Sequence, residues 1–254
     1  MADFEITAAS NPRIKRLVRL RERRYRDDEG VFLVEGPRLV DRAVAAGLSP
    51  AEVYVDRSVD YPGPGPVVTA HPEALARASY RSQSQGVIAV FPQLPTDLGR
   101  LAVSDPALVV VTETIEKPGN LGAMLRTCDA VGADAVVVTG RGVDPFNPNV
   151  VRASQGALFT VPLALTSLQD LGPWMSSHGI GLIAASPASS LALWEVDFTE
   201  SVAILIGAED RGLTQEALGL AAKTIAIPMR GAADSLNASV SLAVIAYEVL
   251  RQRR

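Results

Sequence analysis

The stretch that decides the fold is Ile225–Tyr247, which reads IAIPMRGAADSLNASVSLAVIAY. It opens with a short apolar strand end, and the chain is expected to leave the sheet at Pro228, which has no N–H for a ladder hydrogen bond. A glycine-containing loop follows. Residues 236–250 are apolar on nearly every side, which predicts a buried helix capped by Asp234 or Ser235.

Polar residues at the buried start of this helix need partners. An unpaired hydroxyl or amide group of Ser235 or Asn237 would cost about 1 to 3 kcal/mol there, so each must meet backbone, a partner chain or a ligand. On this stretch alone, the simpler interpretation is a capped core helix with no further role.

Length and composition indicate an ordinary globular protein. The chain has 254 residues, of which 48% are hydrophobic and 20% charged, enough for two domains with cores of their own. No apolar run approaches the roughly 18 residues that span a bilayer, so we expect a cytoplasmic protein without membrane contact. Cys128 is the only cysteine and the two histidines are scattered, so neither an internal disulfide nor a metal site is expected.

The net charge of −4 conceals a basic stretch, residues 13–26, in which eight lysines and arginines accompany a single glutamate. Ser10-Asn11-Pro12 predicts the start of one helix there, with a thin apolar stripe and outward-pointing arginines. Such a cluster neutralises phosphates and releases their counterions, although a charge run can also serve solubility alone. The residues expected to contact RNA or DNA are Arg13, Lys15, Arg16, Arg19, Arg23 and Arg24.

Apolar runs and turn signals divide the chain into two α/β domains, residues 1–98 and 105–254. Residues 1–10 are expected to be a frayed start, after which short strands alternate with helices as far as Phe91. Prolines and glycines between Phe91 and Pro106 indicate a linker. From Leu108 the strands are uniformly apolar, which is typical of a buried parallel sheet.

Three expected strand ends in the second domain carry small and polar residues, and open α/β sheets bind ligands at that edge. The first leads into a helix through PGN at 118–120, with Arg126 further along it; the second is Gly207-Ala208-Glu209; the third is the opening stretch. Taken singly, each has a plain interpretation, such as a tight turn at Gly207 or a helical ion pair between Arg126 and Asp129. No strand is followed by Gly-x-Gly-x-x-Gly, which disfavours a dinucleotide site.

Taken together and in this order, the segments PGNLGAMLRTCDAVGAD, LIGAEDRGL and IPMRGAADSLNASVSLAVIAYEVLRQ resemble the motifs of the SpoU (TrmH) branch of the SPOUT RNA methyltransferases. The resemblance covers about residues 108–254 and includes DPFNPNVVRASQGALFTVP. More loosely, GVFLVEGPRLV resembles the start of the L30e-like substrate-binding domain of ribosomal RNA members. Ala238 stands where the family commonly has valine, and no inactivating departure is visible.

This resemblance implies an α/β fold that physical rules alone would not propose, since knots are essentially absent from proteins. A C-terminal parallel-sheet domain with a deep trefoil knot should follow a smaller L30e-like domain. In the family, backbone groups of the knot bind S-adenosylmethionine, and the knotted domains form a homodimer. The cofactor-binding residues implied on this sequence are Gly207, Ile227, Met229 and Leu236.

The catalytic residues implied by the resemblance are Asn120, Arg126, Glu209, Ser235 and Asn237. Two roles for Arg126 stay open. It can act as the base that removes the ribose 2'-hydroxyl proton, or it can bind a phosphate and stabilise the developing 2'-alkoxide. A guanidinium pKa above about 12 favours the second role.

The expected function is methyl transfer from S-adenosylmethionine to a ribose 2'-hydroxyl of RNA, with 23S ribosomal RNA as the preferred substrate. Cys128 lies among apolar neighbours and is expected to be a structural thiol, which disfavours covalent chemistry on a base. The alternatives are a transfer RNA substrate, or a non-catalytic RNA-binding protein that keeps the fold. A small-molecule nucleotide enzyme is disfavoured, because the glycine fingerprint is missing and the basic stretch would have no use.

Overall fold

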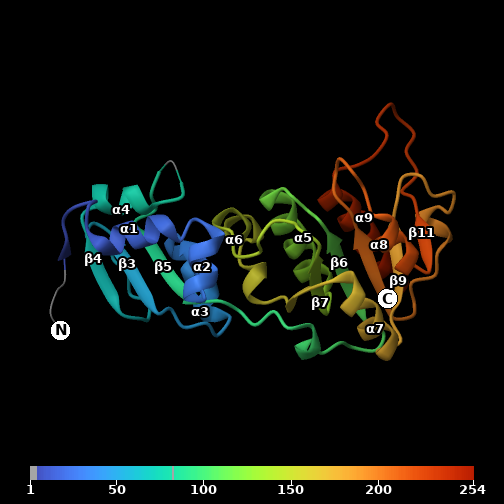
Figure 1. Cartoon of the computed structure of the whole chain (residues 1–254), viewed down its shortest axis with the longest axis horizontal. Coiled ribbons are helices and arrows are strands. Elements are labelled where there is room, and N and C mark those ends of the chain that lie inside the picture. The colour runs from blue at the N-terminus through green and yellow to red at the C-terminus, as the bar shows by residue number, and fades with distance from the viewer. Residues whose placement is uncertain (1–4, 82) are drawn as a thin grey trace. The chain divides into compact units, whose positions relative to one another are not determined.

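The computed structural model describes residues 5–81 and 83–254 of the chain. Its elements fall into two compact units, and Figure 1 labels elements of both. The first unit comprises the described residues up to Leu94 together with Asp144–Phe159, and the second comprises Pro95–Val143 and Thr160–Arg254. Each unit is therefore built from two segments of the chain, because residues 144–159 belong to the first unit. The expected division into domains at residues 1–98 and 105–254 stays a prediction.

The first unit is built on a mixed five-stranded sheet in the order β1-β4-β3-β5-β2. In it, β1, β4 and β3 run parallel, and β5 is antiparallel to both of its neighbours. The elements of its N-terminal part are β1 (Glu5–Ile6), α1 (Pro12–Arg19), α2 (Arg23–Glu29), β2 (Val31–Glu35), α3 (Pro37–Ala45), β3 (Glu52–Asp56), β4 (Val67–Ala70), α4 (Pro72–Ala78) and β5 (Val87–Pro92). The expected alternation of short strands and helices from residue 31 onward is confirmed.

The expectation of a frayed start over residues 1–10 is wrong for its described part, and residues 1–4 lie outside the described residues. Glu5–Ile6 pairs with β4 as an edge strand. Ile6 is fully buried in the same apolar cluster as Ile14 and Leu17, the inner stripe of α1. Burial of Ile6 in this apolar cluster stabilises the short strand.

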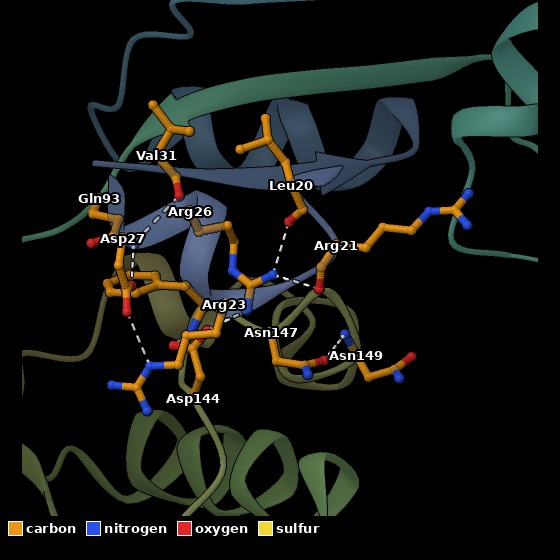
Figure 2. A network of polar contacts seen from close by, with 11 residues as sticks. Leu20, Arg21, Arg23, Arg26, Asp27, Val31, Gln93, Asp144, Asn147 and Asn149 are labelled. Atoms are coloured by element: carbon orange, nitrogen blue, oxygen red, sulfur yellow. Dashed lines mark hydrogen bonds and ion pairs between the residues drawn. The ribbon is translucent and has the colours of Figure 1, made fainter. Parts of the chain in front are cut away.

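The basic stretch forms α1 and α2 instead of one helix. Arg26, expected to point outward, is 1% exposed. Its guanidinium pairs with Asp144, and Nη1 donates to the carbonyl oxygens of Leu20 at 2.8 Å and Arg21 at 2.7 Å (Figure 2). The carbonyls just after α1 therefore accept from a side chain instead of from a continuing helical backbone, which accounts for the break.

The segment 144–159 carries α6 (Pro148–Ser154) and the 3-10 turn η2 (Ala157–Phe159). Asp144 ties its start to α2 through Arg26 and accepts the N–H of Phe146 at 2.9 Å. The rings of Phe146 and Phe159 lie 5.4 Å and 6.2 Å from that of Phe32 in β2. Apolar contacts thus hold the segment on the sheet of the first unit, and the buried ion pair fixes its beginning.

The second unit contains a six-stranded sheet in the order β11-β9-β10-β6-β7-β8. Every neighbouring pair is parallel, which confirms the expected buried parallel sheet, although β8 was not foreseen. Its elements are η1 (Leu98–Arg100), β6 (Leu108–Glu113), α5 (Pro118–Val131), β7 (Ala135–Thr139), β8 (Leu163–Thr166), α7 (Leu168–Ser177), β9 (Gly181–Ala185), η3 (Leu193–Glu195), β10 (Val202–Ile206), α8 (Gln215–Leu220), β11 (Lys223–Ile225) and α9 (Ala238–Gln252). Among the described residues, no helix is both long and apolar enough to cross a bilayer.

The final helix differs from the sequence prediction in two ways. Its cap is Asn237, whose Oδ1 accepts the N–H of Ser239 at 3.0 Å, and not Asp234 or Ser235. Helix α9 contacts α5 and β10 on one side, and on its other side Val240 and Tyr247 are 46% and 52% exposed. The expectation of a helix buried on all sides is therefore wrong within a single chain.

Candidate active site

The carboxyl ends of β11, β9, β10 and β6 lie side by side, because these four strands are consecutive neighbours in a parallel sheet. The three strand exits singled out in the sequence therefore meet at one edge, as predicted. A fourth exit, Ser186-Pro187 after β9, joins them and was missed. Its small residues and proline after an apolar run were the available signal, but only the strand order shows that β9 lies between β10 and β11.

A cleft of about 350 Å³ opens at this edge. Its lining combines apolar side chains such as Ile206 and Ile225 with small residues and acidic groups. The structure brings all four predicted cofactor-binding residues, Gly207, Ile227, Met229 and Leu236, into this lining together with Glu209 and Ser235. The charged residues of the lining are Glu209, Asp210, Arg211 and Asp234, so carboxylates outnumber cations. A slot of this kind suits a flat apolar ring system joined to a cationic group.

The loop after β10 is closed tightly on itself. A Cβ atom at Gly207 would lie 2.6 Å from the carbonyl carbon of Gly212, so only glycine permits this approach. The loop then ends at Thr214, whose N–H and hydroxyl donate to the buried carboxylate of Glu113 at 2.9 Å and 2.6 Å. Gly207 therefore permits the tight turn, and Glu113 anchors the loop that carries Glu209.

Glu209 is the centre of a hydrogen-bonded cluster drawn from three distant parts of the chain. Its carboxylate accepts from Nδ2 of Asn120 at 2.7 Å, from Nδ2 of Asn237 and from Nζ of Lys117. The hydrogen bond from Lys117, followed by that from Asn120, lowers the pKa of Glu209 below its ordinary value. The carboxylate is therefore ionised at neutral pH and acts as an acceptor that orients both amides.

Asn237 is fixed at both ends of its amide. Its Oδ1 caps α9 by accepting from Ser239 and Val240, and its Nδ2 donates to Glu209 and, at 3.2 Å, to Oδ1 of Asn120. The amide nitrogen and oxygen cannot exchange places without losing these bonds. The polar residue that the sequence left without a partner is thus satisfied by the backbone and the cluster together.

Arg126 lies outside this cluster. It follows Asn120 by six residues on α5, which places its Cα about 9 Å further along the helix and about 240° around it. The side chain is exposed and, among the described residues, makes no hydrogen bond or ion pair. Asp129 instead accepts the hydroxyl of Thr160 at 2.9 Å, so the helical ion pair considered for Arg126 does not form.

The remaining predicted site residues have varied surroundings. Ser235 lines the cleft and is exposed. Lys117 was not predicted, because a single lysine before PGN carries no signal until the fold brings Glu209 to it. Cys128 is fully buried, as expected, and burial raises the pKa of its thiol to about 12. No group of three metal-ligating side chains was found in the described part of the chain.

Carboxylates from outside the basic stretch neutralise part of it. The pairs are Arg16 with Glu29 at 2.7 Å and Glu52 at 3.1 Å, Arg23 with Asp27 at 3.2 Å, and Arg24 with Asp28 at 3.9 Å. Arg13, Lys15 and Arg19 are exposed, and Lys15 has no ion pair with any described residue. The six residues predicted to bind RNA therefore differ in how available their charge is.

Two family models match successive parts of the chain. The model of the SpoU rRNA Methylase family matches residues 107–247, and the model of the MRM3-like substrate binding domain matches residues 11–89. An uncharacterized tRNA/rRNA methyltransferase of Synechocystis is 31% identical, covering 98% of this chain and 94% of that protein. The 23S rRNA (uridine(2479)-2'-O)-methyltransferase of Streptomyces viridochromogenes is 31% identical, covering 92% and 87%.

A solved structure is similar over nearly the whole chain. The SpoU methyltransferase AviRb from Streptomyces viridochromogenes, in complex with the cofactor AdoMet, superposes with a TM-score of 0.90 at 29% identity, covering 96% of this chain and 98% of that one. The predicted resemblance and fold class are thereby confirmed. Because the SpoU model matches more than half of the residues and full-length relatives exceed 30% identity, the chain belongs to the SpoU rRNA methylase family.

Proposed function

We propose that this protein transfers a methyl group from S-adenosylmethionine to a ribose 2'-hydroxyl of RNA, with 23S ribosomal RNA as the substrate. The observation that carries the proposal is the arrangement at the carboxyl edge of the second sheet. There the Asn120–Glu209–Asn237 cluster adjoins the cleft that holds the predicted cofactor-binding residues. Family membership supplies the reaction class, because relatives similar to this chain are RNA 2'-O-methyltransferases.

The cleft fits the cofactor on its own chemistry. Ile206, Ile225 and Leu236 offer apolar surface for an adenine ring, and the surplus of carboxylates favours a cationic sulfonium. Bound there, S-adenosylmethionine would supply an electrophilic methyl group to an incoming oxygen. The tightly closed loop 207–212 would hold the adenosine through backbone atoms, because that loop is fixed by Gly207 and by the anchor at Glu113.

The side chains of this chain would position and polarise the ribose. Glu209 is a weak base, because its pKa is lowered, so its role is to orient Asn120 and Asn237. Arg126 is exposed and has no partner among the described residues, so it is available to an RNA phosphate and to the negative charge that grows on the 2'-oxygen. Fixed charges and amides of this kind lower a barrier by several kcal/mol without a metal ion.

Ribosomal RNA is preferred to transfer RNA for a structural reason. Residues 11–89, in the first unit, match the model of a substrate-binding domain. The relative of known substrate that is similar over 92% of this chain acts on 23S ribosomal RNA. We place this reaction in the cytoplasm, where ribosomal RNA is matured.

A homodimer through the knotted second unit completes the proposal. Helix α9 leaves Val240 and Tyr247 exposed on the side away from its contacts with α5 and β10, and a second copy would remove these side chains from water. The trefoil knot itself is an inference from family membership. Sedimentation at micromolar concentration should give twice the 26.8 kDa mass of one chain, and Tyr247→Lys should weaken the association. A species of 26.8 kDa alone would contradict the dimer.

The decisive experiment identifies the atom that is methylated. Purified protein, labelled S-adenosylmethionine and 23S ribosomal RNA should yield one 2'-O-methylated nucleotide, which mapping of the product locates. A synthetic fragment with a 2'-deoxy nucleotide at that position should still bind but accept no methyl group, because only the reacting oxygen is gone. Methylation of the deoxy fragment would instead show a base modification. RNA binding without any transfer would favour the non-catalytic alternative.

A further inference from the structure

A second cavity, of about 380 Å³, lies wholly within the first unit and is separate from the cofactor cleft. Its described lining consists of Tyr80, Arg81, Gln83, Ser84, Gln85 and Arg152. Five of these follow α4 in sequence, whereas Arg152 comes from α6. The cavity is within the range of about 300 to 1,000 Å³ that small ligands occupy.

The beginning of the loop that forms this cavity is held rigidly. Glu35, at the end of β2, accepts the hydroxyl of buried Ser79 and, at 2.9 Å, the N–H of Tyr80. The N–H of Arg81 in turn donates to the hydroxyl of Ser79 at 3.1 Å. The backbone that carries Tyr80 and Arg81 is therefore positioned before any ligand arrives, which reduces the entropy lost on binding.

The charge in the cavity is positive and unsatisfied. No carboxylate lines it among the described residues, and neither Arg81 nor Arg152 forms an ion pair with any of them. In addition, Nε of Arg81 is shielded from solvent and has no hydrogen-bond partner in the described part of the chain. A buried guanidinium N–H without an acceptor is costly. The two guanidinium charges that line the cavity have no carboxylate partner among the described residues, so an anionic group bound there would compensate them.

Arg152 reaches the cavity because α6 is fixed on the first unit. Val150 and Val151 are buried, and the start of the segment is tied down by the Asp144–Arg26 pair visible in Figure 2. The family model for the methylase covers residue 152, while the model for the substrate-binding domain ends at residue 89. Arg152 thus lies in sequence that the methylase model matches, although the residue belongs to the first unit of the structure.

The same cavity offers groups that recognise bases. Tyr80 is 38% exposed, and Arg21 lies over its ring at 5.9 Å, which places a cation on one face. Gln83 and Gln85 are exposed amides. The side chain of Gln85 also lies so close to Gly36 that a Cβ atom there would fall 2.0 Å from its Oε1, so a glycine at position 36 leaves room for this amide.

We propose that this cavity binds an unpaired nucleotide of the RNA substrate, with Arg81 and Arg152 on its phosphate and Tyr80 stacked on its base. Unpaired nucleotides suit this set of groups, since specific RNA recognition relies on stacking of splayed-out bases and on contacts to their edges. This inference rests on the proposed function and assigns substrate recognition to a site that combines Tyr80, Arg81 and residues 83–85 with Arg152 of α6. The basic stretch then adds general attraction to RNA, and the cavity selects where the RNA binds.

The test compares Arg81→Ala/Arg152→Ala with Arg77→Ala, an exposed arginine of the same unit that does not line the cavity. Binding of a fluorescent 23S RNA fragment is measured without S-adenosylmethionine, across a series of salt concentrations. The double variant should bind at least tenfold more weakly. Its plot of log affinity against log salt should be flatter by about 0.7, the contribution of one single-strand phosphate, because both arginines are placed on the same phosphate. Arg77→Ala should match the wild type within about twofold.

Two further measurements separate recognition from folding and from catalysis. Tyr80→Ala should weaken binding about tenfold, whereas Tyr80→Phe, which keeps the ring, should restore it. In steady-state transfer, the double variant should show a raised KM for RNA, an unchanged kcat at saturating RNA and an unchanged Kd for S-adenosylmethionine.

Unchanged RNA affinity and salt dependence in the double variant would overturn the proposal. That result is the one expected if the cavity bound a protein partner instead of RNA. A lowered kcat at unchanged RNA affinity would also overturn it. If the wild type transfers no methyl group but the cavity variants still lose RNA affinity, the proposed function fails while this binding site stands.

Discussion

The Asn120–Glu209–Asn237 cluster of the second unit and the basic stretch of the first unit both contain polar side chains whose partners come from distant parts of the chain. In the cluster, the partners lie 28 to 117 residues apart along the chain and were expected to meet. In the basic stretch, Arg26 pairs with Asp144 and Arg16 pairs with Glu52, which are also distant in sequence. No sequence pattern predicted these two pairs.

The difference lies in the constraint that each local pattern imposes. Asn120 and Glu209 follow strands of a parallel sheet, and the ends of such strands must share one edge. A run of arginines imposes no such constraint, because any carboxylate on the surrounding surface can approach it. A motif that follows a strand therefore predicts which residues will lie close to it in the fold. A run of charged residues does not predict which residues will pair with it. The predictions that follow test both halves of this comparison.

Asp144→Ala should have the largest effect, because it leaves the charge of Arg26 buried without its counterion. Breaking a buried pair in this way costs about 3 to 5 kcal/mol of unfolding free energy. Asp28→Ala is the matched control, since it removes the exposed partner of Arg24 and should cost at most about 1 kcal/mol. Urea denaturation of the three proteins measures the difference.

A double replacement, Arg26→Met with Asp144→Leu, sharpens this result. Apolar residues of similar size often replace a buried pair without loss, so the double variant should recover most of the stability. Equal losses of unfolding free energy in Asp144→Ala and Asp28→Ala would mean that the buried Arg26–Asp144 pair contributes no more than the exposed Arg24–Asp28 pair.

Arg126→Ala should lower methyl transfer by about 10²- to 10³-fold, the usual loss when one preorganised group that stabilises developing charge is removed. The Kd for S-adenosylmethionine should stay within about twofold, because Arg126 does not line the cofactor cleft. Calorimetric titration and a single-turnover assay measure the two quantities. Turnover equal to that of the wild type would remove Arg126 from the catalytic set.

Substitutions within the basic stretch should have a smaller effect that depends on pairing. Lys15→Ala/Arg19→Ala should flatten the salt dependence of RNA binding by about 1.4, whereas Arg23→Ala/Arg24→Ala should flatten it less, because Asp27 and Asp28 already neutralise those arginines. Point substitutions are needed here, since removal of residues 1–26 would also delete buried Ile14 and Leu17. If both variants and the wild type show the same salt dependence of RNA affinity, the basic stretch does not bind RNA and serves solubility alone.

Cys128→Ser should change activity least, by no more than about twofold, because the thiol lies in the core away from the cleft. Burial raises its pKa to about 12, so the folded protein should resist alkylation by iodoacetamide up to about pH 9. A pKa raised on folding gives stability that is complete below the ordinary thiol pKa and declines as the pH rises toward about 12. Rapid labelling of the native protein at pH 8 would contradict the burial.

Much of the candidate site could be predicted from the sequence because its residues sit at fixed distances from apolar strands. PGN at the start of α5 and Glu209 after β10 were correctly assigned to strand exits that meet. The cap of α9 was not, since Asp234, Ser235 and Asn237 are all good capping residues and only backbone geometry selects Asn237. Lys117 and the exit after β9 were missed for a related reason: their relevance depends on strand order and on what lies across the cleft.

The sequence by itself determined the parallel sheet, the smaller α/β unit in front of it and the family, because apolar periodicity and motif spacing are local properties of the chain. Tertiary structure alone decided that residues 144–159 belong with the first unit, that Arg26 is buried on Asp144, and that Arg81 and Arg152 share a cavity. Each of these brings together residues 71 to 127 positions apart along the chain. Such contacts are selected by the packing of whole elements against one another, and no local pattern encodes them.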